Sequence, residues 1–486
     1  MAGPFAFVVL IAYSTFFVAL GLWIGRRARA GEFFIAGRSL SSGLIFSTFL
    51  AANIGASSTV GATSLGYSEG VSAWWWNGSA GLGSLVLAFW VGPRMWREAV
   101  THGDLTVGDF LERRYGRAMR GLVASLIWLG TLTILAAQLL GVAAVLNVVA
   151  GFSLLTGCAI GALVTVSYFT AGGLLSSAWV NLVQLVVILA GFAVAVPFAV
   201  HAAGGWDTVT AAAGSRASVW ASTGPASGWR LLFLLGPAFI VSPGLLQKAY
   251  GAREERAVRH GIAWNGVGLL LFACAPAAIG LAAHALYPAL VKPDLALPTV
   301  LAGALPPAVG MIALAAVFSA EVSSADAVLF MLATSASRDL YRGFVRPDAS
   351  EAEVLRVARI AAVVGSLCGV GVAMVYGSVR AAVGVFYAIL TVTLFVPILG
   401  ALFVRGAGRV AGLASVLTGV PVLAATHYLS GGHGYGVLSP ALAGVLASAA
   451  AFVFAHALAP RPTTPPVDSS AYAPKIPQEK ERKGAE

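Results

Sequence analysis

Residues 318–326, with the sequence FSAEVSSAD, lie within an apolar segment and combine side chains that could hold a cation. Ala320, Ser323 and Ser324 are spaced i, i+3, i+4, so a helix places them on one face. A main-chain carbonyl released from its helical partner, together with two hydroxyl oxygens, suits a small hard cation. We interpret this stretch as half of a sodium site in a membrane transporter.

Two acids, Glu321 and Asp326, flank the serine face. Ionisable groups inside a membrane are costly, and by default they mark a site or a pathway. By the 3.6-residue period, each acid lies about 110° from the centre of the serine face, so neither is expected to be a direct ligand. We expect one acid to tune the charge of the site and the other to face the substrate or a neighbouring helix. The sequence leaves open which acid does which.

A plainer interpretation of the serine pair is also available. Serines in membrane helices often only bond back to their own backbone or help helices to pack. The two acids, and a second polar, interrupted segment near the N-terminus, argue for a site instead.

The composition indicates a protein that crosses a membrane many times. Of the 486 residues, 58% are hydrophobic and 10% are charged, whereas soluble proteins carry roughly 25% charged residues. The apolar runs are about 20 residues or longer, which predicts membrane helices rather than the strands of a barrel. The net charge of +10 does not indicate nucleic acid, because the basic residues sit mostly in short loops.

Hydropathy predicts about thirteen transmembrane helices. They are expected at residues 5–24, 41–66, 70–93, 119–148, 152–170, 174–201, 228–248, 258–286, 306–334, 355–377, 380–404, 408–428 and 437–459. The first run lacks a basic leader and a cleavage site, so we interpret it as a retained span and not as a signal peptide. Arginines concentrate in alternate loops, which predicts an N-terminus outside and a C-terminus in the cytoplasm. The tail, residues 461–486, is too polar to form a core and is expected to be disordered.

Two of the predicted spans are interrupted near their middle. The second contains Gly55 in a polar centre, and the seventh contains Pro237, Pro243 and Gly244. Such residues break a membrane helix and free backbone carbonyls. Two broken spans that lie five apart in the order of helices indicate an inverted-repeat transporter with a binding site at the midplane.

At these residues the chain resembles the sodium:solute symporter family. The resemblance is carried by five segments in order: FFIAGRSLSSG (33–43), TVGDFLERRYG (106–116), YFTAGGLLSSAWVNLVQ (168–184), SPGLLQKAYGAREERAVRHG (242–261) and SAEVSSADAVLFMLATSASRDLYR (319–342). It implies an all-α polytopic fold of the LeuT type, with ten core helices in a 5+5 inverted repeat, one extra helix before and two after. It implies an extra helix and a cytoplasmic loop in residues 1–40, a first inverted repeat in residues 41–201 and a second in residues 228–404. Two C-terminal helices follow in residues 405–460, before the tail.

The resemblance also implies a set of sodium ligands. They are the carbonyls of Ala51, Ile54 and Ala320 and the hydroxyls of Ser323 and Ser324. Many family members carry an Asp that supports the ion where this chain has Asn181, so Glu321 or Asp326 could supply the charge instead.

The family places its substrate between the two broken helices. The candidates in this chain are Asn53, Ser57, Ser58, Trp76, Asn77, Ser242 and Gln247. Asn77 stands where sugar-transporting relatives have an acid, which argues against a sugar. The intracellular aromatic gate of those relatives falls near Gly244, so this plug is absent or built differently.

We therefore expect a sodium-coupled symporter of the plasma membrane that imports a small organic solute such as an amino acid, a carboxylate or an amine. Sodium (Na+) is the expected coupling ion, and the chain is expected to be a monomer or a weak oligomer. The alternative is a proton-coupled transporter or exchanger on the same fold, with Glu321 or Asp326 as the proton carrier. A membrane-embedded enzyme is not expected, because no catalytic motif is recognisable.

Overall fold

The computed structural model describes residues 38–171, 174–220 and 228–459, together with residues 12, 15, 16 and 19. The first expected span and the C-terminal tail therefore lie outside the described residues, apart from those four positions. Within the described part, the chain is almost entirely helical, and two isolated β-bridges are its only extended pairing.

The first half of the chain alternates long helices with short broken ones. Its elements are α2 (Ser42–Asn53), η3 (Ser57–Gly61), α3 (Ala62–Glu69), η4 (Gly70–Ala73), α4 (Trp74–Val86), η5 (Leu87–Val91), α5 (Gly92–His102), α6 (Val107–Tyr115), α7 (Arg117–Ala150), α8 (Leu154–Ala171), α9 (Leu174–Ala202), α10 (Trp206–Ala213) and η6 (Gly214–Ala217).

The second half has the same character. Its elements are α11 (Gly228–Ile240), α12 (Pro243–Tyr250), α13 (Glu255–Phe272), α14 (Cys274–Leu286), η7 (Pro293–Leu295), α15 (Ala296–Gly303), α16 (Pro307–Thr334), η8 (Ser335–Val345), α17 (Glu351–Tyr376), α18 (Val379–Phe403), α19 (Arg409–Leu429) and α20 (Pro440–Leu458).

Nine helices of the described part are long and apolar enough to cross a membrane, or ten if the bent pair at the start of the chain counts as one span. The prediction of a helical protein with many membrane spans is thus confirmed. The predicted count of thirteen is not, because the first span lies outside the described residues and segments such as 154–167 fall short in length.

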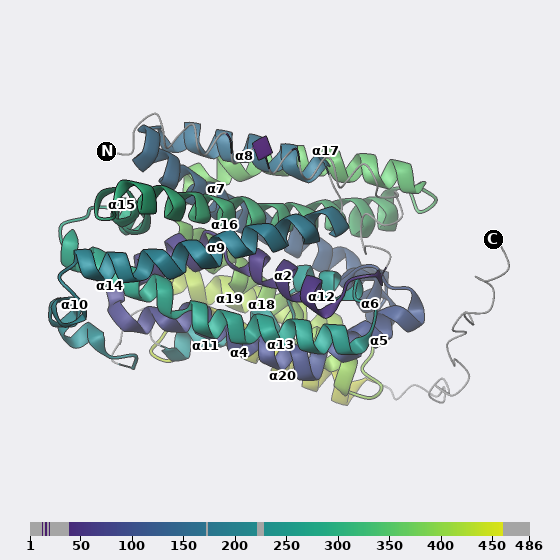
Figure 1. Ribbon diagram of the computed structural model, residues 1–486. Coiled ribbons are helices and arrows are strands. Elements are labelled where there is room, and N and C mark those ends of the chain that lie inside the picture. Colours follow the sequence, from purple (N-terminus) through teal and green to yellow (C-terminus); the bar gives the residue numbers. More distant parts are fainter. Residues whose placement is uncertain are drawn as a thin grey trace.

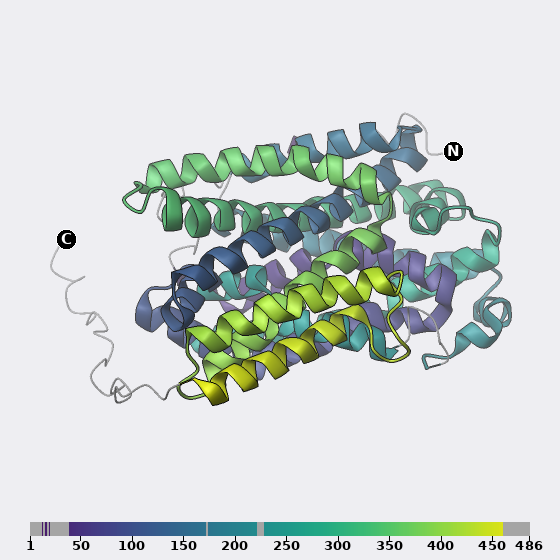
Figure 2. The ribbon, with the colours of Figure 1, turned by 180° about the vertical axis from the view of Figure 1, so that it is seen from behind.

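Helix α16 occupies the interior of the bundle. It packs against α7 and α9 and also contacts α2, α8, α12 and α17. Figure 1 shows α16 running beside α9 across the molecule, with α2 and α12 near the centre. Seen from behind, α19 and α20 form a hairpin against α18 (Figure 2). The helix with the proposed ion ligands is therefore enclosed by other helices.

A glycine sets how closely α9 approaches α16. A Cβ added at Gly191 would lie 2.3 Å from the Cβ of Ala316, so only a residue without a side chain fits. Small residues at such crossings let membrane helices pack closely, since no hydrophobic force draws them together within lipid. This contact holds Asn181 of α9 near the serines of α16.

Both predicted interruptions are breaks in the helices. Helix α2 ends at Asn53 and the chain resumes as η3 at Ser57, with an angle of 61° across the break. Helix α11 ends at Ile240, and α12 begins at Pro243 after Ser242, whose backbone is extended (φ −55°, ψ 117°). The glycine and proline signals therefore placed both breaks correctly.

Candidate functional site

The break after α2 frees a backbone carbonyl toward α16. In an unbroken helix the N–H of Ala56 would bond to the carbonyl of Ala52. Instead, it donates to Oε1 of Gln138 on α7, at 2.8 Å. The carbonyl of Ala52 is left to accept a hydrogen bond from another helix.

The two serines of α16 point at the freed end of α2. The hydroxyl of Ser324 lies 2.9 Å from the carbonyl oxygen of Ala52 and 3.2 Å from that of Ala51. The hydroxyl of Ser323 lies 3.4 Å from the same Ala51 oxygen. Two hydroxyls and two carbonyls from helices about 270 residues apart in sequence thus meet at one point.

Asn181 of α9 completes this cluster. Its Oδ1 accepts from the hydroxyl of Ser323 at 2.9 Å, and its Nδ2 lies 3.4 Å from the hydroxyl of Thr48. Since a hydroxyl carries one proton, donation to Asn181 leaves the lone pairs of Ser323, together with the carbonyl oxygen of Ala51, available to coordinate a cation. An amide oxygen at this position therefore orients Ser323 as a cation ligand without adding a charge.

The remaining expected ligands are the carbonyls of Ile54 and Ala320, which are near the cluster in sequence. Ile54 is the first residue past the end of α2, and its N–H still bonds back to the carbonyl of Leu50. Ala320 is fully buried one turn before the serines on α16, and because α16 is an unbroken helix from Pro307 to Thr334, the expected release of a carbonyl here is not observed. Such a set of neutral oxygens matches the preference of hard cations. The described residues contain no group of three or more His, Cys, Asp or Glu side chains that could hold a transition metal.

Glu321 points away from the serine cluster. Its Oε1 is 2.8 Å from the hydroxyl of Thr59 in η3, and its side chain is fully buried. Its Oε2 has no hydrogen-bond partner among the residues that the structure describes, and it packs against Gly141 of α7, where an added Cβ would lie 2.7 Å away. Glu321 therefore links the ion helix to the second half of the broken span.

Asp326 faces a different neighbour. It interacts electrostatically with Lys248 of α12, a buried cation whose Nζ also donates to the carbonyl of Thr48 at 3.1 Å. Lys248 and Asn181 both contact Thr48, so the two side chains approach α2 at the same turn. The two acids thus leave α16 toward different helices, as the helical wheel predicted.

Most of the candidate substrate residues form one polar cluster around η3. The hydroxyl of Ser57 accepts from Nε1 of Trp76 at 3.0 Å and is bonded to Tyr387 of α18. The ring of Tyr387 lies 5.5 Å from that of Phe239 on α11. The Ser57 hydroxyl is thus bonded to two aromatic side chains, from α4 and α18, and Phe239 of α11 packs against the second of them.

Asn77 and Asn53 are joined to this cluster through Ser58. Asn77 donates to the carbonyl of Ser58 at 3.0 Å, and the hydroxyl of Ser58 bonds to the carbonyl of Asn53. The side chain of Asn53 donates to Asn265 of α13 at 3.0 Å. Ser242 lies at the second break. Gln247 is separate from this group, since it lines a small cavity near Thr106 and Asp339.

Several of these partners were not predicted from the sequence. They are Thr59, Gln138, Lys248, Asn265, Phe239 and Tyr387. Gln138 was recognisable in principle, because it is a single amide in the apolar run 130–146. The others required knowledge of which helices are neighbours.

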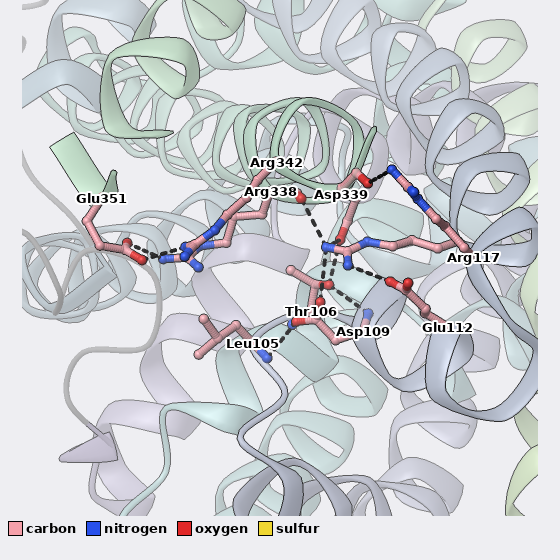
Figure 3. A network of polar contacts seen from close by, with 11 residues as sticks. Leu105, Thr106, Asp109, Glu112, Arg117, Arg338, Asp339, Arg342 and Glu351 are labelled. Atoms are coloured by element: carbon pink, nitrogen blue, oxygen red, sulfur yellow. Dashed lines mark hydrogen bonds and ion pairs between the residues drawn. The ribbon is translucent and has the colours of Figure 1, made fainter. Parts of the chain in front are cut away.

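A network of charges joins α6 to η8 at the arginine-rich end of the bundle (Figure 3). Thr106 caps α6, and its hydroxyl donates to Oδ1 of Asp339 at 2.6 Å. Arg120 of α7 forms ion pairs with Asp109 at 3.0 Å, Glu112 at 2.7 Å and Asp339 at 3.2 Å. A partly buried arginine with several carboxylate partners fixes α6, α7 and η8 relative to one another.

Comparison with known proteins gives a consistent family. The sequence model of the sodium:solute symporter family matches residues 33–419. The sodium/glucose cotransporter of Vibrio parahaemolyticus is 23% identical over 76% of this chain and 75% of that protein. High-affinity choline transporter 1 of Caenorhabditis elegans is 27% identical over 74% of this chain and 67% of that protein.

A solved structure has the same fold. It is that of a sodium-coupled sialic acid symporter in a substrate-bound, outward-open state. The two structures align with a TM-score of 0.79 over 95% of this chain and 99% of that one, at 16% sequence identity. At this identity the likeness concerns the fold alone.

Proposed function

Because the chain belongs to the sodium:solute symporter family, we propose that it imports a small organic solute with sodium bound between the broken α2 and the serines of α16. The single observation that carries this assignment is the meeting of the Ser323 and Ser324 hydroxyls with the carbonyls of Ala51 and Ala52. Sodium-coupled symport itself follows from the family, whose members are cotransporters. The expectation that the chain is not an enzyme is confirmed by the same match.

The proposed transport cycle uses both broken helices. The LeuT-type arrangement would consist of two inverted repeats, residues 41–201 and 228–404, with the ligands held where α2 and α11–α12 are interrupted. Sodium would favour the outward-open conformation because it binds that conformation more tightly, and the solute would then enter a formed pocket. Rocking of one helix group against the other would expose both ligands to the opposite side.

The proposed orientation has the N-terminus outside and the C-terminus in the cytoplasm. The arginine-rich end formed by α5, α6 and η8 would then face the cytoplasm, in agreement with the positive-inside rule. Arg113, Arg114, Arg338 and Arg342 all lie at this end.

The side chains that the structure describes in the polar cluster around Ser57 are uncharged. Its members are a hydroxyl, amides and aromatic rings, and the acid Glu321 bonds to Thr59, two residues further along η3. Residues two apart on a helix point to different sides, so Glu321 does not join the aromatic cluster. We therefore propose an amino acid, a carboxylate or an amine with a sizeable apolar part as the substrate.

An uptake screen tests this proposal. Proteoliposomes would be offered radiolabelled amino acids, carboxylates, amines and sugars, each with an inward sodium gradient and with potassium in its place. A solute of the proposed classes that accumulates only with sodium would support the assignment. Accumulation of sugars alone would overturn the proposed substrate class.

Proton coupling through Glu321 is the alternative function, and its replacement by glutamine separates the two. The Glu321→Gln variant keeps the contact with Thr59 but cannot carry a proton. We expect sodium-driven uptake to persist, within about tenfold of the wild-type rate, because Glu321 does not contact the serine cluster. The measurement compares uptake driven by a sodium gradient with uptake driven by a pH gradient.

The proton-coupled account predicts the opposite pattern. Uptake by the wild type would follow a pH gradient without sodium, and Glu321→Gln would abolish it. The same variant also tests for a cationic substrate bound by Glu321, since unchanged solute affinity would exclude that contact.

A further inference from the structure

A small cavity lies between α16, the helix that carries Ser323 and Ser324 (the ion helix), and the arginine-rich end of the bundle. Its volume is about 20 Å³, which is room for roughly one water molecule and too little for an organic solute. Both the ion helix and the second broken helix face it. Its walls include Thr106, Gln247, Met331, Thr334, Ser335 and Asp339.

The cavity lies on the same side of α16 as the serine cluster. Met331 follows Ser324 by seven residues, which is about 10 Å along a helix and a rotation of only about 20°. Thr334 follows Ser323 by eleven residues and Ser335 follows Ser324 by eleven, which is about three helical turns and again a rotation of only about 20°. One face of α16 therefore runs from the proposed ion ligands past Met331 into the cavity.

Met331 occupies the space above a glycine of the broken helix. A Cβ added at Gly244 would lie 3.3 Å from Sδ of Met331, and no other residue comes within 4 Å of it. Met331 is buried and also lines the cavity. A bulky side chain at residue 244 and a methionine at residue 331 would thus compete for the same space.

Polar side chains also line the cavity. Thr106 and Asp339 are both lining residues and are bonded to each other (Figure 3), and Asp339 is held in turn by its ion pair with Arg120, which does not line the cavity. Gln247 lies one helical turn beyond Gly244, and its Nε2 has no partner in the described part of the chain. Met331 and the bonded pair Thr106 and Asp339 therefore line the same small, mostly apolar cavity.

We propose that Met331, packed on Gly244, is the inner gate that closes the cytoplasmic pathway below the ligand site. Its side chain reaches the space next to Gly244 of α12 from α16. A thioether chain with three rotatable bonds can leave such a position at low cost. This inference rests on the proposed sodium-coupled transport and on the proposed orientation.

The test measures leak of sodium in the absence of solute. Proteoliposomes containing the Met331→Ala variant should take up ²²Na⁺ at least about tenfold faster than those with wild type, because the inner gate lacks its side chain. Met374→Ala is the matched control, since Met374 lies on α17 and is 37% exposed. Its leak should equal that of wild type.

A second variant separates gating from loss of packing. Adding Gly244→Phe to Met331→Ala fills the same space from α12 and should restore a low leak. A leak in Met331→Ala no faster than in Met374→Ala would overturn the proposal, as would a leak that Gly244→Phe leaves unchanged. Sodium binding to the purified Met331→Ala protein should match wild type, so failure of the gate is distinguishable from failure of the ion site.

Discussion

Replacing Ser323 and Ser324 together by alanine is expected to weaken sodium binding by about 100-fold or more. The double variant removes both hydroxyl ligands and leaves only backbone carbonyls, those of Ala51 and Ala52 among them, as oxygens of the proposed site. Even changes to groups that merely support a metal ligand typically cost about 10–100-fold in affinity, so loss of two ligands exceeds that range.

Binding of ²²Na⁺ to purified protein measures this effect directly. The matched control is Ser415→Ala with Ser448→Ala, two fully buried serines of α19 and α20 away from α16. This control should bind sodium as the wild type does. Equal sodium affinity in the Ser323→Ala, Ser324→Ala protein and in the control would refute the site.

Gly55→Ala is the single substitution expected to have the largest effect. A Cβ at Gly55 would lie 2.3 Å from the hydroxyl oxygen of Ser324 and 2.7 Å from Oε1 of Gln138. It would displace both the ligand hydroxyl and the amide that satisfies the broken helix. Overpacking of this kind typically costs about 1–3 kcal/mol, and here the displaced atoms are those of the site.

The measurement is the rise in melting temperature that sodium causes relative to potassium. A ligand that binds only the folded state raises its stability by mass action, so loss of the rise reports loss of binding. Gly55→Ala should melt at a lower temperature than the wild type and show no sodium response. Gly384→Ala on α18, where an added Cβ meets nothing within 4 Å, should keep the full response. A normal sodium response in Gly55→Ala would contradict the proposed geometry.

Many helices of this fold could be predicted from the sequence, because a membrane helix is recognisable from the long apolar run of its own residues. Residues 119–148 and 306–334 are long apolar runs, and they correspond to α7 and α16. The breaks were equally local, since Gly55 and the Pro243–Gly244 pair mark them in the chain itself. The meeting of Ser323 and Ser324 with Ala51 came from the family resemblance rather than from the pattern of residues.

The surroundings of the site could not be predicted in the same way. The contact of Glu321 with Thr59 joins residues 262 positions apart, and it depends on how η3 is rotated after the 61° bend. The position of Lys248 near Asp326 depends on how α12 faces α16. A helical wheel gives the directions in which Glu321 and Asp326 leave their own helix, but it does not say which helix each one meets.

The loss of an aromatic side chain at residue 244 illustrates the same limit. The sequence indicated that a plug was absent there or built differently, and only the packing of α16 on α12 placed Met331 in that space.

The most direct test of the central claim is concentrative uptake in proteoliposomes, using the solute that the screen identifies. With an inward sodium gradient, the account predicts accumulation above the external concentration in wild type and none in the Ser323→Ala, Ser324→Ala variant. With potassium in place of sodium, it predicts none in either protein. Undiminished accumulation without sodium, or in the double variant, would contradict it.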